Sequence, residues 1–116
     1  MKTKSKIVLS GNPLSTQGVY RNHGHIRFMT NEARARKEQY QWEATSQWKG
    51  PIIKTPFNIS VKLYFGDKRK RDWDNFHKIS MDALTGIVWE DDSLIQTATV
   101  EKLFDKDNPR IEIEVN

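Results

Sequence analysis

An alternation of apolar and polar residues between positions 57 and 65 is the clearest pattern along the chain. Its apolar positions are Phe57, Ile59, Val61, Leu63 and Phe65, with Asn, Ser, Lys and Tyr between them. Because successive side chains of a strand point to opposite faces, this pattern predicts a strand with one buried face. Shorter or less regular patterns predict further strands at residues 6–9, 94–104 and 110–115, and a turn at 105–108 joins the last two.

The segment from residue 30 to residue 48 has the composition of a helix. It contains neither Pro nor Gly, is rich in Ala, Arg, Glu and Gln, and can be capped by Thr30 or Asn31. Trp42 points away from its apolar stripe. That stripe is short and consists of Ala33, Tyr40 and Ala44.

A second helix is predicted from Trp73 to about Thr85, and Gly86 ends it. Between the first strand and the first helix, Gly and Pro residues indicate an irregular stretch. The length predicts one domain that covers residues 1–116. We expect an α+β fold in which a mixed, largely antiparallel sheet of four to five strands packs with two helices.

The composition narrows the class of protein. The chain has 116 residues and no cysteine, which excludes disulfides and thiolate zinc sites. No apolar run approaches the roughly 18 residues needed to cross a bilayer, and no secretory signal follows Met1, so a cytoplasmic protein with no membrane partner is expected. The 19 Lys and Arg exceed the 15 Asp and Glu, which gives a net charge of +4. This mild excess favours a polyanionic partner only slightly.

The segment richest in chemistry is a run of cations followed by two carboxylates. In a helix that starts at Trp73, Asp74 and Lys78 lie four residues apart, project away from the apolar face and can pair. Asp72 can join Asp74 only if the chain is still extended there, because residues i and i+2 of an extended chain share a side. We therefore expect the helix to begin after Asp72. The cations before it are Lys68, Arg69, Lys70 and Arg71.

Two interpretations of this segment stay open. Mg²⁺ and Mn²⁺ prefer oxygen ligands, so Asp72 and Asp74 can hold a metal ion. Alternatively, Asp72 only caps the helix and Asp74 is only a favourable first-turn charge. The basic run either draws a phosphate backbone toward the carboxylates or forms a solvated face at a sheet edge. Arg21, among basic and aromatic residues of the irregular stretch, is a further candidate DNA contact.

A second acidic cluster, Glu90-Asp91-Asp92, precedes the strand predicted at 94–104. Acidic turns before strands are common, so the cluster alone does not indicate a site. Asp92 can reach the pocket of Asp74 only if the chain returns alongside the second helix. Val88-Trp89 is the candidate for that buried return.

Taken together, these residues resemble the signature of RusA-type Holliday junction resolvases. The signature has a basic run, an Asp-x-Asp-Asn element, a Lys four residues after its second Asp, an Asp-Ala-Leu-Thr helix end and an Asp-Asp pair. The matching positions here, in the same order, are Arg69-Lys70-Arg71, Asp72-Trp73-Asp74-Asn75, Lys78, Asp82-Ala83-Leu84-Thr85 and Asp91-Asp92. Five elements in register make the likeness specific.

The resemblance implies a RusA-like fold and an Mg²⁺-dependent homodimer that nicks four-way DNA junctions symmetrically in recombination and repair. Mn²⁺ substitutes for Mg²⁺, and no organic cofactor is implied. The catalytic lysine matches Lys78, which stabilises charge on the phosphorus or moves a proton. The metal polarises the scissile phosphate and activates a water molecule. By position, the metal ligands are Asp72, Asp74 and Asp92, with Asp91 as the less favoured neighbour, and the DNA contacts are Lys68 to Arg71.

Other functions also fit the residues. One is an endonuclease for flaps or other branched DNA, and another is a non-catalytic DNA-binding module whose acidic residues only cap and turn. Small resolvases of this type frequently belong to phages or prophages, which leaves such an origin open. A two-fold junction needs two matched sites, so a C2 dimer is expected, with Trp42 or Trp48 either at its interface or in the core.

Overall fold

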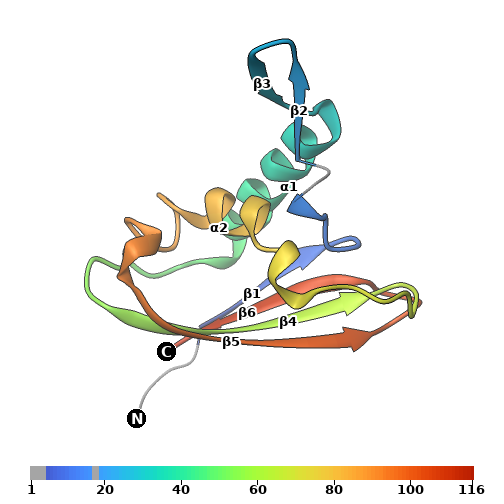
Figure 1. Ribbon diagram of the computed structural model, residues 1–116. Coiled ribbons are helices and arrows are strands. Elements are labelled where there is room, and N and C mark those ends of the chain that lie inside the picture. The colour runs from blue at the N-terminus through green and yellow to red at the C-terminus, as the bar shows by residue number, and fades with distance from the viewer. Residues whose placement is uncertain (1–4, 17–18) are drawn as a thin grey trace.

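A four-stranded sheet forms the base of the molecule in the computed structural model, which describes residues 5–16 and 19–116 (Figure 1). In spatial order the strands are β1 (Ser5–Ser10), β6 (Arg110–Val115), β4 (Phe57–Phe65) and β5 (Ile95–Phe104). The inner strand β6 runs antiparallel to its neighbours β1 and β4, whereas β4 and β5 run parallel. This mixed α+β arrangement confirms the predicted fold class.

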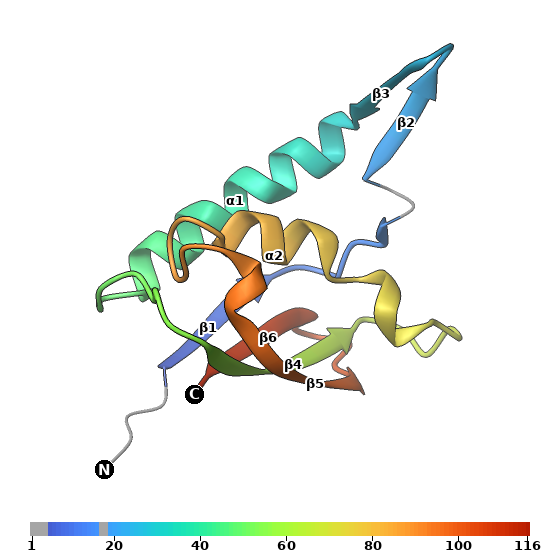
Figure 2. The same cartoon turned by 60° about the vertical axis from the view of Figure 1, so that its left-hand side comes forward.

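Two helices, α1 (Asn31–Gln47) and α2 (Lys78–Leu84), lie over one face of this sheet (Figures 1 and 2). Thr30 caps α1, since its side-chain oxygen accepts a hydrogen bond of 3.1 Å from the backbone of Ala33. The buried positions of α1 are the predicted ones, Ala33, Tyr40 and Ala44. No helix among the described residues is long and apolar enough to cross a bilayer.

The core lies between the helices and the sheet. The alternating residues of β4 point one set of side chains into it, and all five apolar positions of that strand are buried. The largest fully buried side chain is that of Trp89, which packs on Phe57 with the ring centroids 5.2 Å apart. Trp89 belongs to the segment that returns from α2 to β5, so the predicted buried return is confirmed.

The stretch predicted to be irregular contains a hairpin, which the sequence analysis missed. Its strands are β2 (Tyr20–His23) and β3 (Ile26–Met29), joined by two residues. Gly24 is the first of these and has a φ of 64°, the pattern of a tight hairpin turn that favours glycine. The misleading feature was the polarity of the strands, because residues 21–28 are all exposed and show no buried face.

The second predicted helix is broken into two pieces. A 3-10 helix η2 (Trp73–Asn75) comes first, and α2 begins only at Lys78. One cause is His77, whose ring nitrogen Nε2 lies 2.7 Å from the carbonyl of Trp73, the group that the backbone of His77 would bind in a continuous helix. The other is Phe76, which turns inward and packs edge-on against Phe65 at 5.0 Å.

Candidate active site

Asp72 and Asp74 lie on the turn that follows β4 and the basic run at residues 68–71, here called the basic loop. Asp72 is extended, with φ of −83° and ψ of 131°, and η2 begins directly after it, so the prediction that the helix starts after Asp72 is confirmed. Both side chains are exposed. In the described part of the chain, no hydrogen bond or salt bridge occupies either carboxylate. These two acids are therefore open to an external cation.

Lys78 does not pair with Asp74, and that expectation is wrong. Its ammonium group lies 3.1 Å from Asp82, one turn further along α2. The break in the helix removes the i, i+4 relation between Asp74 and Lys78 that a continuous helix would give. The hydrogen bond and charge of Asp82 raise the pKa of Lys78, and the nearby Tyr20 and Asp92 act in the same direction. Lys78 is thus held protonated near Asp92.

His77 lies between η2 and α2 and interacts electrostatically with the carboxylate of Asp74. Burial lowers the pKa of His77, while its bond to the carbonyl of Trp73 and the carboxylate of Asp74 oppose that shift. Its ring is engaged with the backbone, which agrees with a structural role.

The second acidic cluster separates into residues with different roles. Asp91 caps the short 3-10 helix η3 (Asp92–Leu94) by accepting a hydrogen bond of 2.9 Å from the backbone of Ser93. That bond lowers the pKa of Asp91. Asp92 is exposed and is the member of the pair that acts on Lys78. Asp91 is therefore engaged in capping η3, whereas Asp92 is the acid of the pair whose charge acts on Lys78.

Trp89 fixes the position of this cluster. Its indole N–H donates a 3.0 Å hydrogen bond to the hydroxyl of Thr85 at the end of α2. Ile53 binds the residues on either side of Trp89 through two backbone hydrogen bonds of 2.9 Å. The amide of Ile53 donates to the carbonyl of Val88, and the carbonyl of Ile53 accepts from the amide of Glu90. Asp92 therefore follows a rigid, buried element.

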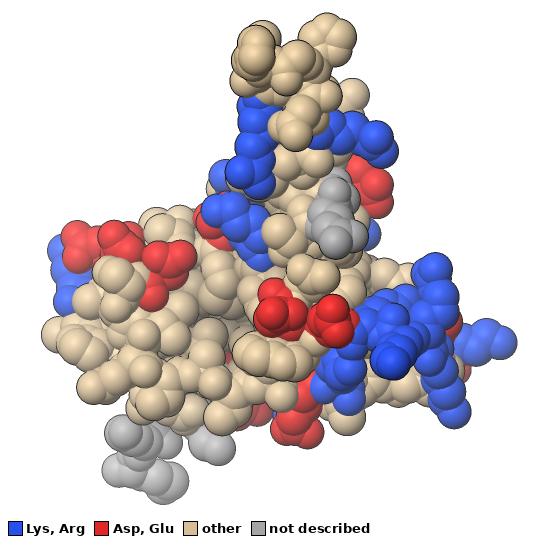
Figure 3. Space-filling model, in the orientation of Figure 1, with Lys and Arg blue, Asp and Glu red and all other residues tan. Residues whose placement is uncertain are grey.

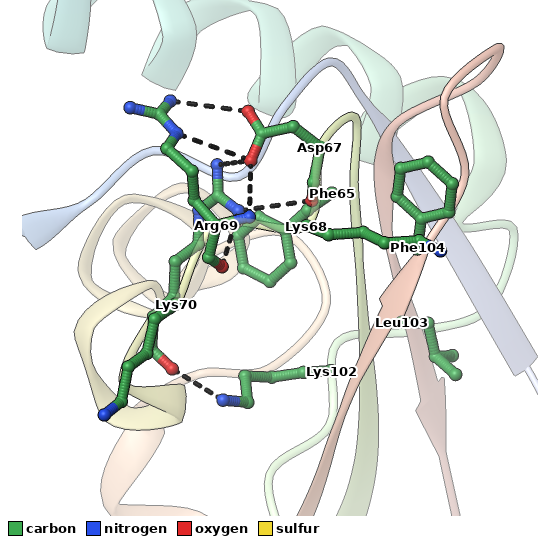
Figure 4. A pocket seen from close by; sticks show the side chains of 9 residues that line it. Phe65, Asp67, Lys68, Arg69, Lys70, Lys102, Leu103 and Phe104 are labelled. Atoms are coloured by element: carbon green, nitrogen blue, oxygen red, sulfur yellow. Dashed lines mark hydrogen bonds and ion pairs between the residues drawn. The ribbon is translucent and has the colours of Figure 1, made fainter.

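The basic run, which ends at Arg71 directly before Asp72 in the chain, lines an open hollow of about 660 Å³ (Figure 4). Arg71 is the fixed member, because its guanidinium lies 2.8 Å from Asp67 and stacks 4.3 Å from the ring of Phe65. The backbone amide of Arg69, together with the side chains of Arg69 and Arg71, lowers the pKa of Asp67 to about 2. The remaining cations, Lys68, Arg69 and Lys70, are exposed.

Lys102 joins this hollow from the neighbouring strand and was missed by the sequence analysis. Its ammonium group donates a 2.5 Å hydrogen bond to the carbonyl of Arg71, directly before Asp72. Lys102 lies on β5 opposite Leu63, and only the parallel pairing of β4 and β5 brings it to the basic loop. No pattern in the sequence indicated that pairing.

The predicted acids do not form one tight cluster. Among the residues that the structure describes, no three acid or imidazole groups lie close enough together to surround a metal ion. The donor chemistry nevertheless fits Mg²⁺, which takes one or two carboxylates and completes its shell with water and phosphate oxygens. Asp72 and Asp74 supply two such groups, both exposed and without internal partners among the described residues.

The remaining predicted contact, Arg21, lies on β2 of the hairpin, outside the basic loop. The same hairpin supplies residues that the sequence analysis did not single out as site residues, Tyr20 beside Lys78 above all. The Gly24-His25 pair between two short strands was a signal for the hairpin, because a Gly at the first position of a two-residue loop is typical of such turns.

Comparison with known proteins identifies the family of the chain. Residues 10–116 match the family model "Endodeoxyribonuclease RusA". The chain belongs to the RusA endodeoxyribonuclease family. A similar member is the crossover junction endodeoxyribonuclease RusA of Aquifex aeolicus (strain VF5), which is 31% identical over 64 residues. That alignment covers 53% of this chain and 51% of the relative, so the likeness spans about half the length of each.

Proposed function

We propose that this protein is a metal-dependent endonuclease that resolves four-way DNA junctions by paired nicks. The observation that carries the proposal is the pair Asp72 and Asp74, two exposed carboxylates without a hydrogen bond or salt bridge among the described residues. They directly follow the basic run that lines an open hollow. A polyanionic backbone drawn to the cations is thereby presented to groups that bind a divalent ion. Membership of an endodeoxyribonuclease family supports the same reaction, and the name of the relative from Aquifex aeolicus supports the junction substrate.

Mg²⁺, or Mn²⁺ in its place, would be held by Asp72 and Asp74. Asp92 would serve as a third ligand only on a closer approach to these two acids, because no three such groups cluster among the described residues. Bound there, the ion would polarise the scissile phosphate. Asp91 is the weaker candidate ligand because it already caps η3. Lys78 is assigned to charge stabilisation at the phosphate, since Asp82 keeps its ammonium protonated and makes it a poor proton acceptor.

The DNA contacts are assigned to the basic loop and to Arg21 of the hairpin. Figure 3 shows basic side chains gathered at the end of the sheet, next to acidic side chains at the centre of that face, with further basic side chains around the hairpin. Phosphate contacts of this kind position a duplex without reading its sequence. The loop residues that make them are Lys68, Arg69, Lys70 and Arg71.

Symmetric nicking of a two-fold junction requires two matched active sites, so we also propose a C2 homodimer. Of the two candidate tryptophans, Trp48 packs against the core and donates its indole N–H to the carbonyl of Pro51 at 3.2 Å. Trp42 is 78% exposed on α1 and is the better candidate for the interface. Light scattering on wild type and on Trp42→Ser gives the mass of each; a dimer that becomes a monomer in the variant supports this assignment.

The deciding experiment follows the strands of a labelled four-way junction in Mg²⁺ and in EDTA. We expect paired symmetric nicks from the wild type in Mg²⁺ only, and a loss of about 100-fold or more in Asp74→Asn, because changes to residues that only support a metal ligand already cost roughly 10–100-fold. Glu101→Gln, which neutralises an exposed carboxylate on the face of the sheet away from the helices, is the matched control and should cut normally.

Two other outcomes would assign a different function. Efficient cutting of flaps or forks with an intact four-way junction would make the protein a branched-DNA endonuclease of another type. Tight junction binding without any cut, in Mg²⁺ or Mn²⁺, would remove the enzymatic assignment and leave a DNA-binding module.

A further inference from the structure

The hairpin β2–β3 projects beyond the helical layer, past the N-terminal end of α1 (Figures 1 and 2). Residues 21–28 are exposed along its whole length and include two arginines and two histidines but no carboxylate. A two-stranded hairpin with this little burial adds almost nothing to the core. Its charge and position therefore call for an explanation in terms of an anionic ligand.

The two arginines of the hairpin lie on opposite faces. Cross-strand partners share a face, so Arg27 lies on the same side as Asn22, and Tyr20 lies there too because it is two residues from Asn22. Arg21 lies opposite Phe28 on the other side. The hairpin therefore offers two cations of equal charge in different surroundings.

The Arg27 face borders an open hollow of about 340 Å³, whose walls are Thr16, Tyr20, Asn22 and Arg27. The guanidinium of Arg27 stacks over the ring of Tyr20, 4.2 Å from its centroid. Within the part of the chain that the structure describes, no carboxylate pairs with Arg27. Stacking orients the cation but leaves its N–H groups available.

The hollow adjoins the candidate active site at two points. The hydroxyl of Thr16 donates a 3.0 Å hydrogen bond to the carbonyl of Asn75, the last residue of η2, one position after Asp74. Tyr20 lies close enough to Lys78 to raise its pKa. A strand bound at the carboxylates thus has the Arg27 hollow next to it.

We propose that this hollow binds one backbone phosphate of the DNA strand held in the active site, a few nucleotides from the cut. Arg27 supplies the charge and a planar pair of donors, and Asn22 supplies an amide donor. A strand so held is gripped on the hairpin side as well as on the basic-loop side, which fixes the scissile phosphate between them. The inference rests on the proposed endonuclease function and adds a positioning site to it.

The test combines a protein substitution with a neutral phosphate in the DNA. Four-way junctions carrying a single uncharged methylphosphonate, moved one position at a time near the cut, are cleaved by wild type, Arg27→Gln and Arg21→Gln under single-turnover conditions in Mg²⁺. Binding of each junction is measured in EDTA. Arg21→Gln is the comparison variant, because it removes the same charge from the same hairpin on the opposite face. Since Arg21 is assigned to a separate DNA contact, its loss should slow the cleavage of every junction alike and leave the sensitivity at the phosphate bound by Arg27 unchanged.

We expect Arg27→Gln to cut the unmodified junction about tenfold more slowly or worse, as for loss of a charge-assisted hydrogen bond. At one position, the methylphosphonate should slow cleavage by wild type and by Arg21→Gln to a similar extent. Arg27→Gln should cleave that modified junction as fast as it cleaves the unmodified one. Equal sensitivity of Arg27→Gln and wild type at every position would overturn the phosphate site while leaving the endonuclease standing. If the wild type cuts no junction at all, both the phosphate site and the endonuclease function are overturned. This outcome differs from the previous one, in which the wild type still cuts.

Discussion

Thr85→Val is the substitution that most directly tests how α2 and the return segment hold the second acidic cluster. Valine keeps the shape of threonine but removes the hydroxyl that accepts the hydrogen bond from the fully buried Trp89. The same hydroxyl donates to the carbonyl of Met81 at 2.8 Å, but that carbonyl also receives the backbone amide of Thr85 at 3.1 Å and stays satisfied. The cost is therefore that of one buried indole N–H without a partner, about 1–3 kcal/mol.

A double-mutant cycle with Trp89→Phe isolates this term. Phenylalanine has no N–H, so the single substitution costs only the lost hydrogen bond and the smaller ring, about 1–3 kcal/mol. In the double variant no donor is left unsatisfied, and its destabilisation should fall short of the sum of the two singles by about 1 kcal/mol or more. Thr85→Ser, which keeps the acceptor, should lie close to wild type.

The assay is urea unfolding followed by fluorescence, with the free energy of unfolding taken from linear extrapolation. Junction cleavage well below the unfolding transition is measured in parallel, because a displaced Trp89 also displaces Asp92, three residues further along. Additive free energies, within about 0.3 kcal/mol, would refute the reasoning, since they would mean that the indole N–H gains nothing from Thr85.

Three further predictions concern charge. Asp82→Asn should lower the free energy of unfolding by about 0.3–0.5 kcal/mol at low salt and by less at high salt, because its i, i+4 pair with Lys78 is partly exposed; urea unfolding at two ionic strengths checks this. The pKa of Asp67 in the folded chain is about 2, below its ordinary value of 3.8, so the ionised carboxylate stabilises the fold at a pH above about 4. This contribution should be lost as the pH falls from about 4 to about 2. Urea midpoints across that range should show the loss in wild type and not in Asp67→Asn. Burial lowers the pKa of His77 below 6.5, so His77 takes up a proton more readily in the unfolded chain, and the stability of the fold should fall as the pH drops through and below 6.5. Thermal melts should show a flatter pH dependence in His77→Gln. An unchanged dependence would contradict the lowered pKa of His77.

The sheet was predictable wherever one face of a strand is buried and the other is not. β4 alternates without exception, and its predicted bounds match the structure. β5 alternates poorly because it is an edge strand, paired on one side only and exposed over most of its length. Charged residues such as Glu101 and Lys102 suit such an edge, where they discourage pairing with another chain. Its parallel pairing with β4 depends on the crossover through α2, a long-range feature that no local pattern records.

The sequence predicted a set of candidate site residues, but it did not predict how their side chains are arranged. Four consecutive cations followed by two closely spaced carboxylates can be recognised directly in the sequence. The extended conformation of Asp72 was predicted because only an extended chain lets its side chain share a side with that of Asp74. The partner of Lys78 could not be predicted, because α2 begins only at Lys78, after a break at which His77 contacts the carbonyl of Trp73 and Phe76 turns inward against Phe65.

The parallel pairing of β4 and β5 also determines how the parts of the site are spread. The end of β4 delivers the basic loop, Asp72 and Asp74, whereas Asp92 stands before the start of β5, close to the opposite end of β4. Nine residues of strand are about 30 Å long, so these acids can approach one another only because η2 and α2 run back over the sheet. Lys78 is the first residue of α2, within electrostatic reach of Asp92 and four residues after Asp74. Lys78 thus lies between the two acidic segments along the chain and feels the electrostatic field of Asp92, the position that its proposed role in charge stabilisation at the phosphate requires.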